Sequence, residues 1–155
     1  MACTQIIRKQ ILKKNIKEIW DFMSSPSNLE NITPKSMNFQ ILSKNTDQKM
    51  YPGMIIKYRV TPLLYIPMVW VTEITHVKEK KYFVDEQRIG PYKMWHHEHI
   101  FEQKNEGILM TDIITYVPPF GVFGSISNFL FIKNKINKIF DYRQEVLNRI
   151  FNNKK

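Results

Sequence analysis

The sequence predicts an α+β domain in which a curved antiparallel sheet of about six to seven strands wraps around one long C-terminal helix. Between residues 37 and 117, apolar and polar residues alternate with a period of two, which is typical of strands. From residue 122 onward, apolar residues instead recur every three or four positions, as on a helix. The connections between most of the alternating segments are short, so successive strands are expected to pair antiparallel.

The composition indicates one folded domain over residues 1–155. A chain of this length can bury roughly two thirds of its unfolded surface. An apolar fraction of 43%, with ten Phe, seven Tyr and three Trp, excludes a disordered chain. The formal charge of +9 could attract anionic membranes or nucleic acid. Because the lysines are scattered and not interleaved with aromatic residues on one strand, nucleic acid is not an expected partner.

The cysteine content and the apolar runs bear on the compartment. The single cysteine, Cys3, cannot form a disulfide within the chain. No apolar segment typical of a signal peptide follows Met1, and no apolar run approaches the length of a membrane span. We therefore expect a cytoplasmic protein that is a monomer or a weak homodimer.

The N-terminal part predicts one strand and two short helices. Residues Thr4–Leu12 are rich in isoleucine and polar residues and lack Gly and Pro, as expected of a first strand. Asn15 and Glu18 have the spacing of a capping box, and apolar residues then recur at helical spacing. Ser25-Pro26 starts a second helical turn, because proline suits the first helical position, and Thr33-Pro34 ends it.

The remaining elements are a series of strands and the long helix. The expected strands are Met37 to Ile41, Met54 to Val60, Tyr65 to Val77, Tyr82 to Ile89, Tyr92 to Glu102 and Ile108 to Val117. Pro118-Pro119 ends the sheet, and an amphipathic helix of about thirty residues follows. Such a helix is not stable alone, so its apolar side must pack on the sheet.

Local motifs along the chain carry a family resemblance. They are Ile19 to Phe22, Asn28-Leu29 to Thr33-Pro34, Pro52-Gly53, Trp70 to Ile74, Phe83 to Gln87 with Gly90-Pro91, Trp95 to His99 with Phe101, Asp112 with Tyr116, Pro119 to Gly121, and Phe140 with Tyr142-Arg143. In this order they resemble the helix-grip proteins of the START and SRPBCC type, which include polyketide cyclase/dehydrase-like and birch-pollen-allergen-like proteins, and in particular a bacterial ligand-binding branch. The resemblance implies binding of lipids, sterols, polyketides, quinones or hormones, with cyclisation or dehydration in a minority of members. It brings no defined active site.

Polar side chains are predicted to share the concave face of the sheet with large aromatic ones. Strand alternation places them on one side; they are Asp85, Gln87, Trp95, His97, His99, Asp112 and Tyr116. Buried polar groups need partners, because each costs a few kcal/mol when unpaired. The cluster orients a polar group on an apolar ligand, or it is a self-satisfied network in which histidine donates to aspartate and fixes the strand register, and the two roles are compatible.

The rest of the predicted cavity wall is aromatic and aliphatic. The candidate lining residues are Phe39, Tyr58, Trp70, Phe129 and Ile136, and such residues also suit a plain core. A strongly curved sheet around one helix encloses volume that a chain of this size need not fill, which favours a cavity. The segment Pro62 to Pro67 is expected at its rim, where apolar residues suit a cavity mouth or a peripheral membrane contact.

Two kinds of chemistry compete with simple binding. His97-x-His99 with an aspartate has a spacing compatible with zinc, but no cysteine or further histidine supports it, so neither a metal nor a cofactor is expected. A histidine–aspartate pair could do general acid–base work, with Tyr116 as proton donor; the candidate catalytic residues are Asp85, His97, His99, Asp112 and Tyr116.

Three functions follow from these patterns. The preferred one is a carrier or sensor of a hydrophobic small molecule such as a lipid, polyketide or isoprenoid, without catalysis. The second is a cyclase or dehydratase that uses the same cavity. The third is a lipid carrier that docks on membranes.

Overall fold

The computed structural model describes residues 3–44, 46–63, 66–119 and 131–153. Within these residues the strands form one seven-stranded sheet of order β1-β7-β6-β5-β4-β3-β2, in which all neighbours are antiparallel. The strands are β1 Thr4–Leu12, β2 Gln40–Ile41, β3 Met54–Leu63, β4 Ile66–Lys78, β5 Tyr82–Ile89, β6 Met94–Lys104 and β7 Gly107–Val117. The helices are α1 Ile16–Met23 and α3 Lys133–Phe151, with 3₁₀ turns η1 Pro26–Leu29 and η2 Lys35–Met37.

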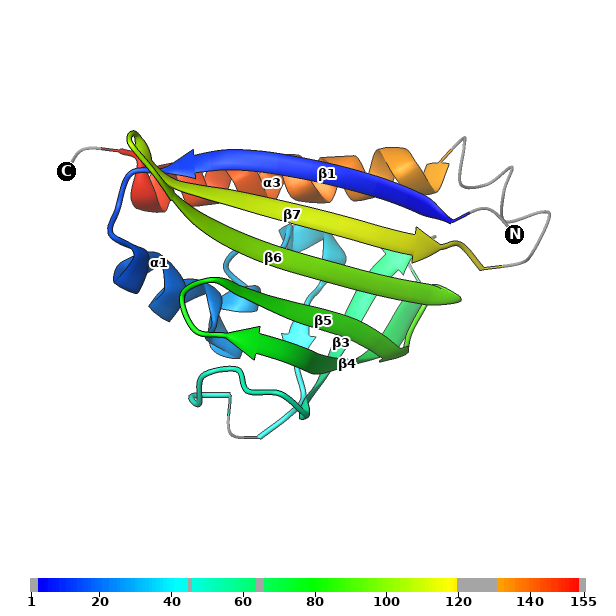
Figure 1. Cartoon of the computed structure of the whole chain (residues 1–155). Helices are drawn as coiled ribbons and strands as arrows, with labels where there is room; N and C mark the ends of the chain where they lie inside the picture. Colours follow the sequence, from blue (N-terminus) through cyan, green and yellow to red (C-terminus); the bar gives the residue numbers. More distant parts are fainter. Residues whose placement is uncertain (1–2, 45, 64–65, 120–130, 154–155) are drawn as a thin grey trace.

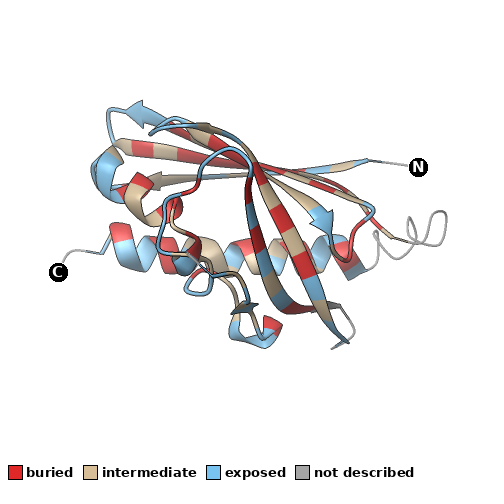
Figure 2. Cartoon of the chain, turned by 90° about the horizontal axis from the view of Figure 1, so that it is seen from below, coloured by how far each residue is buried: buried red, intermediate tan, exposed pale blue. Residues whose placement is uncertain are grey.

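The sheet curves over α3, which confirms the predicted α+β helix-grip architecture (Figure 1). Figure 2 shows α3 running along one face of the sheet, with buried positions alternating along the strands. Polar side chains of β1 fix the helix at the sheet edge, since Arg8 donates to Asn137 Oδ1 at 3.0 Å and Gln10 donates to Asn148 Oδ1 at 2.8 Å. The apolar side of α3 can therefore pack against the concave face.

The sequence explains where α1, the helix after β1, begins and which of its sides is buried. The Asn15 side chain accepts a hydrogen bond from the Glu18 backbone N–H at 2.9 Å, so the predicted N-cap is confirmed. Ile19, Trp20 and Met23 are buried on the inner side of α1. The Trp20 ring meets Phe83 edge-on with ring centroids 6.0 Å apart, which ties α1 to the sheet.

Some of the predicted first and last residues of the helices and strands are confirmed, and others are wrong. β1 and β5 have the predicted bounds, whereas the second predicted helix is only the 3₁₀ turn η1. The predicted strand from Met37 is wrong in its first half, because Met37 ends η2 and Asn38 has a left-handed φ of 44° that interrupts the extended backbone. Of the predicted thirty-residue helix, α3 accounts for Lys133–Phe151, and residues 122–130 lie outside the described residues.

The core divides into two apolar clusters. One gathers Trp20, Phe83 and Phe101 with the C-terminal part of α3. The other gathers Trp70 and Trp95 with the N-terminal part of α3. Polar side chains of β5, β6 and β7 lie where the clusters meet, since His99 stacks on Phe83 and His97 meets Trp95 edge-on, and they form the candidate site.

Candidate functional site

A cavity of about 120 Å³ lies between the concave face of the sheet, α3 and the segment from η1 to β2. This volume is several times the space that one ordered water needs. Most of its wall is apolar, as in small-molecule sites. The lining residues are Leu29, Ile32, Thr33, Met37, Phe39, Met50, Ile56, Tyr58, Val60, Trp70, Thr72, Ile74, Phe83, Asp85, Tyr92, Trp95, His97, His99, Ile136, Ile139, Phe140 and Arg143.

Four ionisable side chains from three neighbouring strands meet at one wall of this cavity. We call Asp85, His97, His99 and Asp112 the His–Asp cluster. Strand register brings them together, since Asp85 lies opposite His97 and Asp112 lies opposite His99. The two histidines are two residues apart on β6 and therefore project from the same face. His97, His99 and Asp112 are buried, and the Asp85 side chain is 17% exposed.

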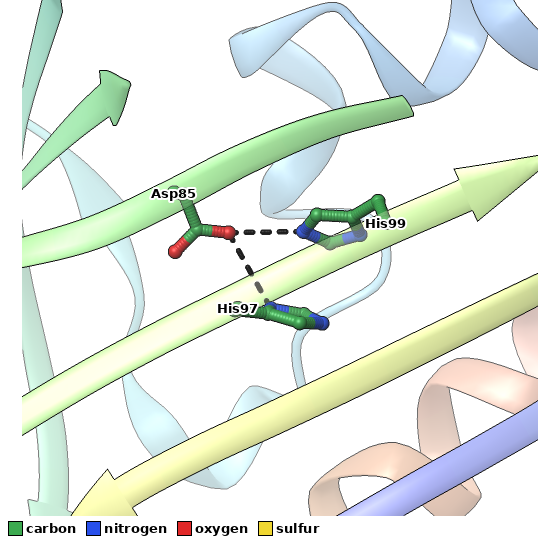
Figure 3. A group of neighbouring side chains, drawn as sticks. All are labelled: Asp85, His97 and His99. Atoms are coloured by element: carbon green, nitrogen blue, oxygen red, sulfur yellow. Dashed lines mark hydrogen bonds and ion pairs between the residues drawn. The ribbon is translucent and has the colours of Figure 1, made fainter. Parts of the chain in front are cut away.

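Each histidine of the cluster lies between the two aspartates. Asp85 Oδ2 is 2.9 Å from His99 Nε2 and 3.4 Å from His97 Nδ1 (Figure 3). Asp112 Oδ1 is 3.0 Å from His97 Nε2 and 2.9 Å from His99 Nδ1. The last contact is close but poorly aligned for a hydrogen bond, so we treat it as electrostatic. The four groups thus form a closed ring of contacts.

The two aspartates lie on different sides of the histidines. Asp85 lines the cavity together with His97 and His99, whereas Asp112 is absent from the lining. Arg143 of α3, which also lines the cavity, has its Nη1 3.6 Å from Asp112 Oδ1. The Arg143 guanidinium lies 5.2 Å from the centre of the Phe140 ring. Asp85 and both histidines therefore face the cavity, and a cation lies beside Asp112.

Charges within the cluster stabilise its ionised forms. Burial alone raises the pKa of Asp85 and Asp112, but hydrogen bonds and charges from His97 and His99 outweigh it, so both carboxyl pKa values lie below the usual range. Burial alone lowers the pKa of His97, but hydrogen bonds to Asp112 and Asp85 outweigh it and raise the net pKa. Both carboxylates are consequently ionised at neutral pH.

A second polar feature lies at the aromatic wall. Trp70 Nε1 of β4 is buried and has no hydrogen-bond partner among the described residues. Its ring lies 5.4 Å from that of Trp95 and 5.6 Å from that of Tyr92, between ring centroids. The neighbouring Tyr58 hydroxyl pairs with Thr72 Oγ1 at 2.8 Å, and burial together with the Asp85 charge raises its pKa, so it is a neutral phenol. The indole N–H is therefore a donor without an acceptor.

The predicted site residues fall into three groups. Those that line the cavity are Phe39, Tyr58, Trp70, Asp85, Trp95, His97, His99 and Ile136. Asp112 and Tyr116 are buried behind this wall, where Tyr116 packs on the rings of Tyr92 and Trp95. Gln87 is outside the lining, and Phe129 lies outside the described residues.

Gln87 ties the loop between β5 and β6. Its Nε2 donates to the Tyr92 carbonyl at 2.6 Å, and its Oε1 accepts from the Tyr92 N–H at 3.2 Å. The pairing of β4 with β5 shifts at this point, between Thr72 and Val71. The period of two therefore no longer identifies the inner face, and Ile89 beyond it is 61% exposed.

Sequence reasoning missed Arg143 as a site residue. It follows Ile136 by seven residues and Phe140 by three, so all three lie on the same side of α3. This helical spacing was the available signal. His96, by contrast, lies on the outer face of β6 beside Glu86, as its place between two inward-facing residues predicts.

The rim segment on which the predicted membrane contact depends is described only in part. Ile66 at the predicted rim is exposed, while residues 64 and 65 lie outside the described residues. No helix in the described ranges is both long enough and apolar enough to span a membrane.

Solved proteins of distant sequence share this fold. The protein CV1439 of Chromobacterium violaceum matches with a TM-score of 0.73 at 8% identity, over 97% of this chain and 98% of that one. The protein Ms6760 of Mycobacterium smegmatis gives 0.65 at 15% identity, over 94% and 92%. The major latex-like protein 151 of Panax ginseng gives 0.60 at 14% identity, over 92% and 97%.

These likenesses establish the fold. The chain is a structural match to SRPBCC and birch-allergen-like proteins over nearly its full length, as its motifs predict. No protein-family model matches it, and no curated protein is significantly similar to it in sequence. What the cavity holds must therefore be argued from its own residues.

Proposed function

We propose that the protein binds a small, largely apolar molecule in the cavity and that this molecule carries a hydrogen-bond acceptor. The observation that carries the proposal is Trp70, a residue of the cavity wall whose buried indole N–H has no partner among the described residues. A buried polar group without a partner costs about 1–3 kcal/mol. A ligand that offers an oxygen to this N–H recovers that cost.

The shape and chemistry of the wall support the same kind of ligand. Aromatic rings of Phe39, Tyr58 and Trp70 stand side by side, with centroids 4.8 Å and 5.9 Å apart along the row. Such rings favour a flat or conjugated molecule through stacking and edge contacts. The family resemblance of the sequence motifs implies binding of hydrophobic ligands, which agrees with this proposal.

The role of a carrier or sensor is tested with two matched probes, acetophenone and its hydrocarbon analogue ethylbenzene. We expect both to enter the cavity and only the ketone to move the indole N–H resonance of Trp70 downfield in NMR spectra of the full chain. In Trp70→Phe the preference for the ketone should fall by about 2- to 12-fold, the worth of one hydrogen bond at 0.5–1.5 kcal/mol.

Two results would overturn the proposal. One is that neither probe shifts resonances of cavity residues. The other is that the ketone preference is the same in Trp70→Phe as in the wild type. Probe binding is measured on chelator-treated protein, so the outcome does not depend on metal ions.

A second candidate function is a cyclase or dehydratase, and one observation favours it. His97 and His99 line the cavity next to Asp85, so a bound molecule would meet groups that can accept and donate protons. The test is whether a compound extracted from the protein is converted on prolonged incubation. Conversion that is lost in His97→Gln but kept in His96→Gln would establish the enzyme over the carrier.

A further inference from the structure

The His–Asp cluster has more contacts than neutral histidines can satisfy. Each imidazole has both ring nitrogens near a carboxylate oxygen, in four contacts of 2.9, 2.9, 3.0 and 3.4 Å. A neutral imidazole donates from one nitrogen only and presents a lone pair on the other. With both histidines neutral, two lone pairs would therefore face ionised oxygens across short distances.

The positions of the two aspartates determine the direction in which each histidine lone pair points. Asp112 contacts His97 Nε2 and His99 Nδ1, and it lies on the side away from the cavity. If Asp112 accepts from His97 Nε2 and its charge holds the proton of His99 on Nδ1, the lone pairs of His97 Nδ1 and His99 Nε2 both turn toward Asp85. Figure 3 shows these two nitrogens pointing at the same carboxylate oxygen, Asp85 Oδ2.

The spacing of these three donor atoms fits one metal ion. All three lie within 4.8 Å of one another, and the two nitrogens are 2.9 Å and 3.4 Å from the oxygen. Two donors bound at about 2.0–2.1 Å to one zinc ion lie about 2.9 Å apart at a right angle and about 3.4 Å apart at the tetrahedral angle. Both nitrogen–oxygen separations therefore match a shared ion, and the two nitrogens, which lie within 4.8 Å of each other, must lie within about 4.1 Å to share it.

We propose that Asp85, His97 and His99 bind a divalent transition-metal ion at the wall of the cavity, with Asp112 orienting both histidines from behind. Two imidazoles and one carboxylate suit zinc or ferrous iron, whereas calcium and magnesium prefer oxygen donors alone. A carboxylate that accepts from the second nitrogen of a ligating histidine is the usual outer support of such sites. Arg143, 3.6 Å from Asp112, balances that outer carboxylate.

The ion would face the molecule in the cavity. Its three ligands line the cavity and Asp112 does not, so the coordination positions left open point inward. An oxygen of the bound molecule would complete the coordination, and this step alone rests on the proposed function. The sequence argued against a metal because neither Cys3 nor a further histidine supports the pair; the structure adds an outer carboxylate that contacts both histidines.

The competing occupant is a proton, which would make the cluster the self-satisfied network that the sequence also allows. A direct titration with metal ions distinguishes a bound proton from a bound metal ion. Tag-free full-length protein is treated with chelator, dialysed and titrated with Zn²⁺ alone by calorimetry, and with Co²⁺ alone by visible absorption. We expect one Zn²⁺ per chain and cobalt d–d bands of a low-coordinate nitrogen–oxygen site.

Matched variants locate the ion. Asp85→Asn and His97→Gln should weaken zinc binding by about a hundredfold or more, and Asp112→Asn by about 10–100-fold, the usual effect of losing an outer partner. His96→Gln is the control, because His96 is the neighbouring histidine on the outer face of β6 and should bind zinc as the wild type does. The fold of each variant is checked by circular dichroism.

A measurement on the wild type covers the case in which a variant does not fold. In ¹H–¹⁵N spectra of the histidine rings, Zn²⁺ should shift His97 and His99 and leave His76 and His96 in place. The proposal is overturned if no stoichiometric zinc binds, or if His96→Gln loses as much affinity as His97→Gln. Such a failure leaves the apolar-ligand proposal intact, because that proposal is tested with chelator present.

Discussion

The substitution Asp112→Asn measures how strongly the buried charges of the His–Asp cluster depend on one another. Asp112 is 6% exposed and lies within 3.0 Å of a nitrogen of each histidine. Asparagine has nearly the same shape and can keep a carbonyl oxygen at the Oδ1 position that both histidines contact, but it carries no charge. Removing one partner of a buried ion pair typically costs 3–5 kcal/mol, since the other charges stay buried without compensation.

We therefore expect Asp112→Asn to lower the free energy of unfolding by about 3–5 kcal/mol. In a chain of this size that corresponds to a fall in Tm of about 6–20 °C. The assay is urea unfolding of chelator-treated protein, with equal slopes confirming that only stability has changed. The matched control is Asp141→Asn, because Asp141 pairs with Arg8 at 2.9 Å with its side chain 56% exposed, and should cost at most about 1 kcal/mol. Equal midpoints for the two variants would refute the reasoning.

Two further predictions concern the fold. Asn15→Ala should cost about 1 kcal/mol in thermal unfolding, because the Asn15 side chain caps the Glu18 N–H of α1, and an unchanged Tm would show that the cap contributes nothing. Gly107→Ala should cost about 1–3 kcal/mol, because Gly107 has a φ of 138° and a Cβ there would lie 2.5 Å from the Leu12 carbonyl oxygen. Urea unfolding checks this second prediction, and a Gly107→Ala midpoint equal to the wild type would contradict it.

Much of the fold was predictable because, in most helices and strands, the local spacing of apolar and polar residues agrees with the structure that forms. In β6 the period of two runs without interruption, so the shared face of Trp95, His97 and His99 could be predicted from spacing. The same rule placed Asp85 opposite His97 once the sheet order was known. The meeting of these residues at one wall thus follows from sequence and topology together.

Other features needed the structure because a distant contact overrides the local pattern. Alternation predicted that Gln87 lines the cavity, but the pairing with β4 is irregular there, and hydrogen bonds hold its amide against the backbone of the loop residue Tyr92. Met37 fits a strand by hydropathy, yet the left-handed Asn38 turns the backbone there. The closeness of Arg143 to Asp112 joins α3 to β7, and no spacing along the chain encodes that distance.

The central claim is that the cavity holds a small apolar molecule, and native mass spectrometry of the protein purified from its own host tests it most directly. We expect a reproducible additional mass that is lost on denaturation. Solvent extraction should then yield an apolar compound bearing an oxygen acceptor. Trp70→Phe purified in parallel should retain less of it. Protein that is consistently empty in such preparations, and that also takes up neither acetophenone nor ethylbenzene, would contradict the account.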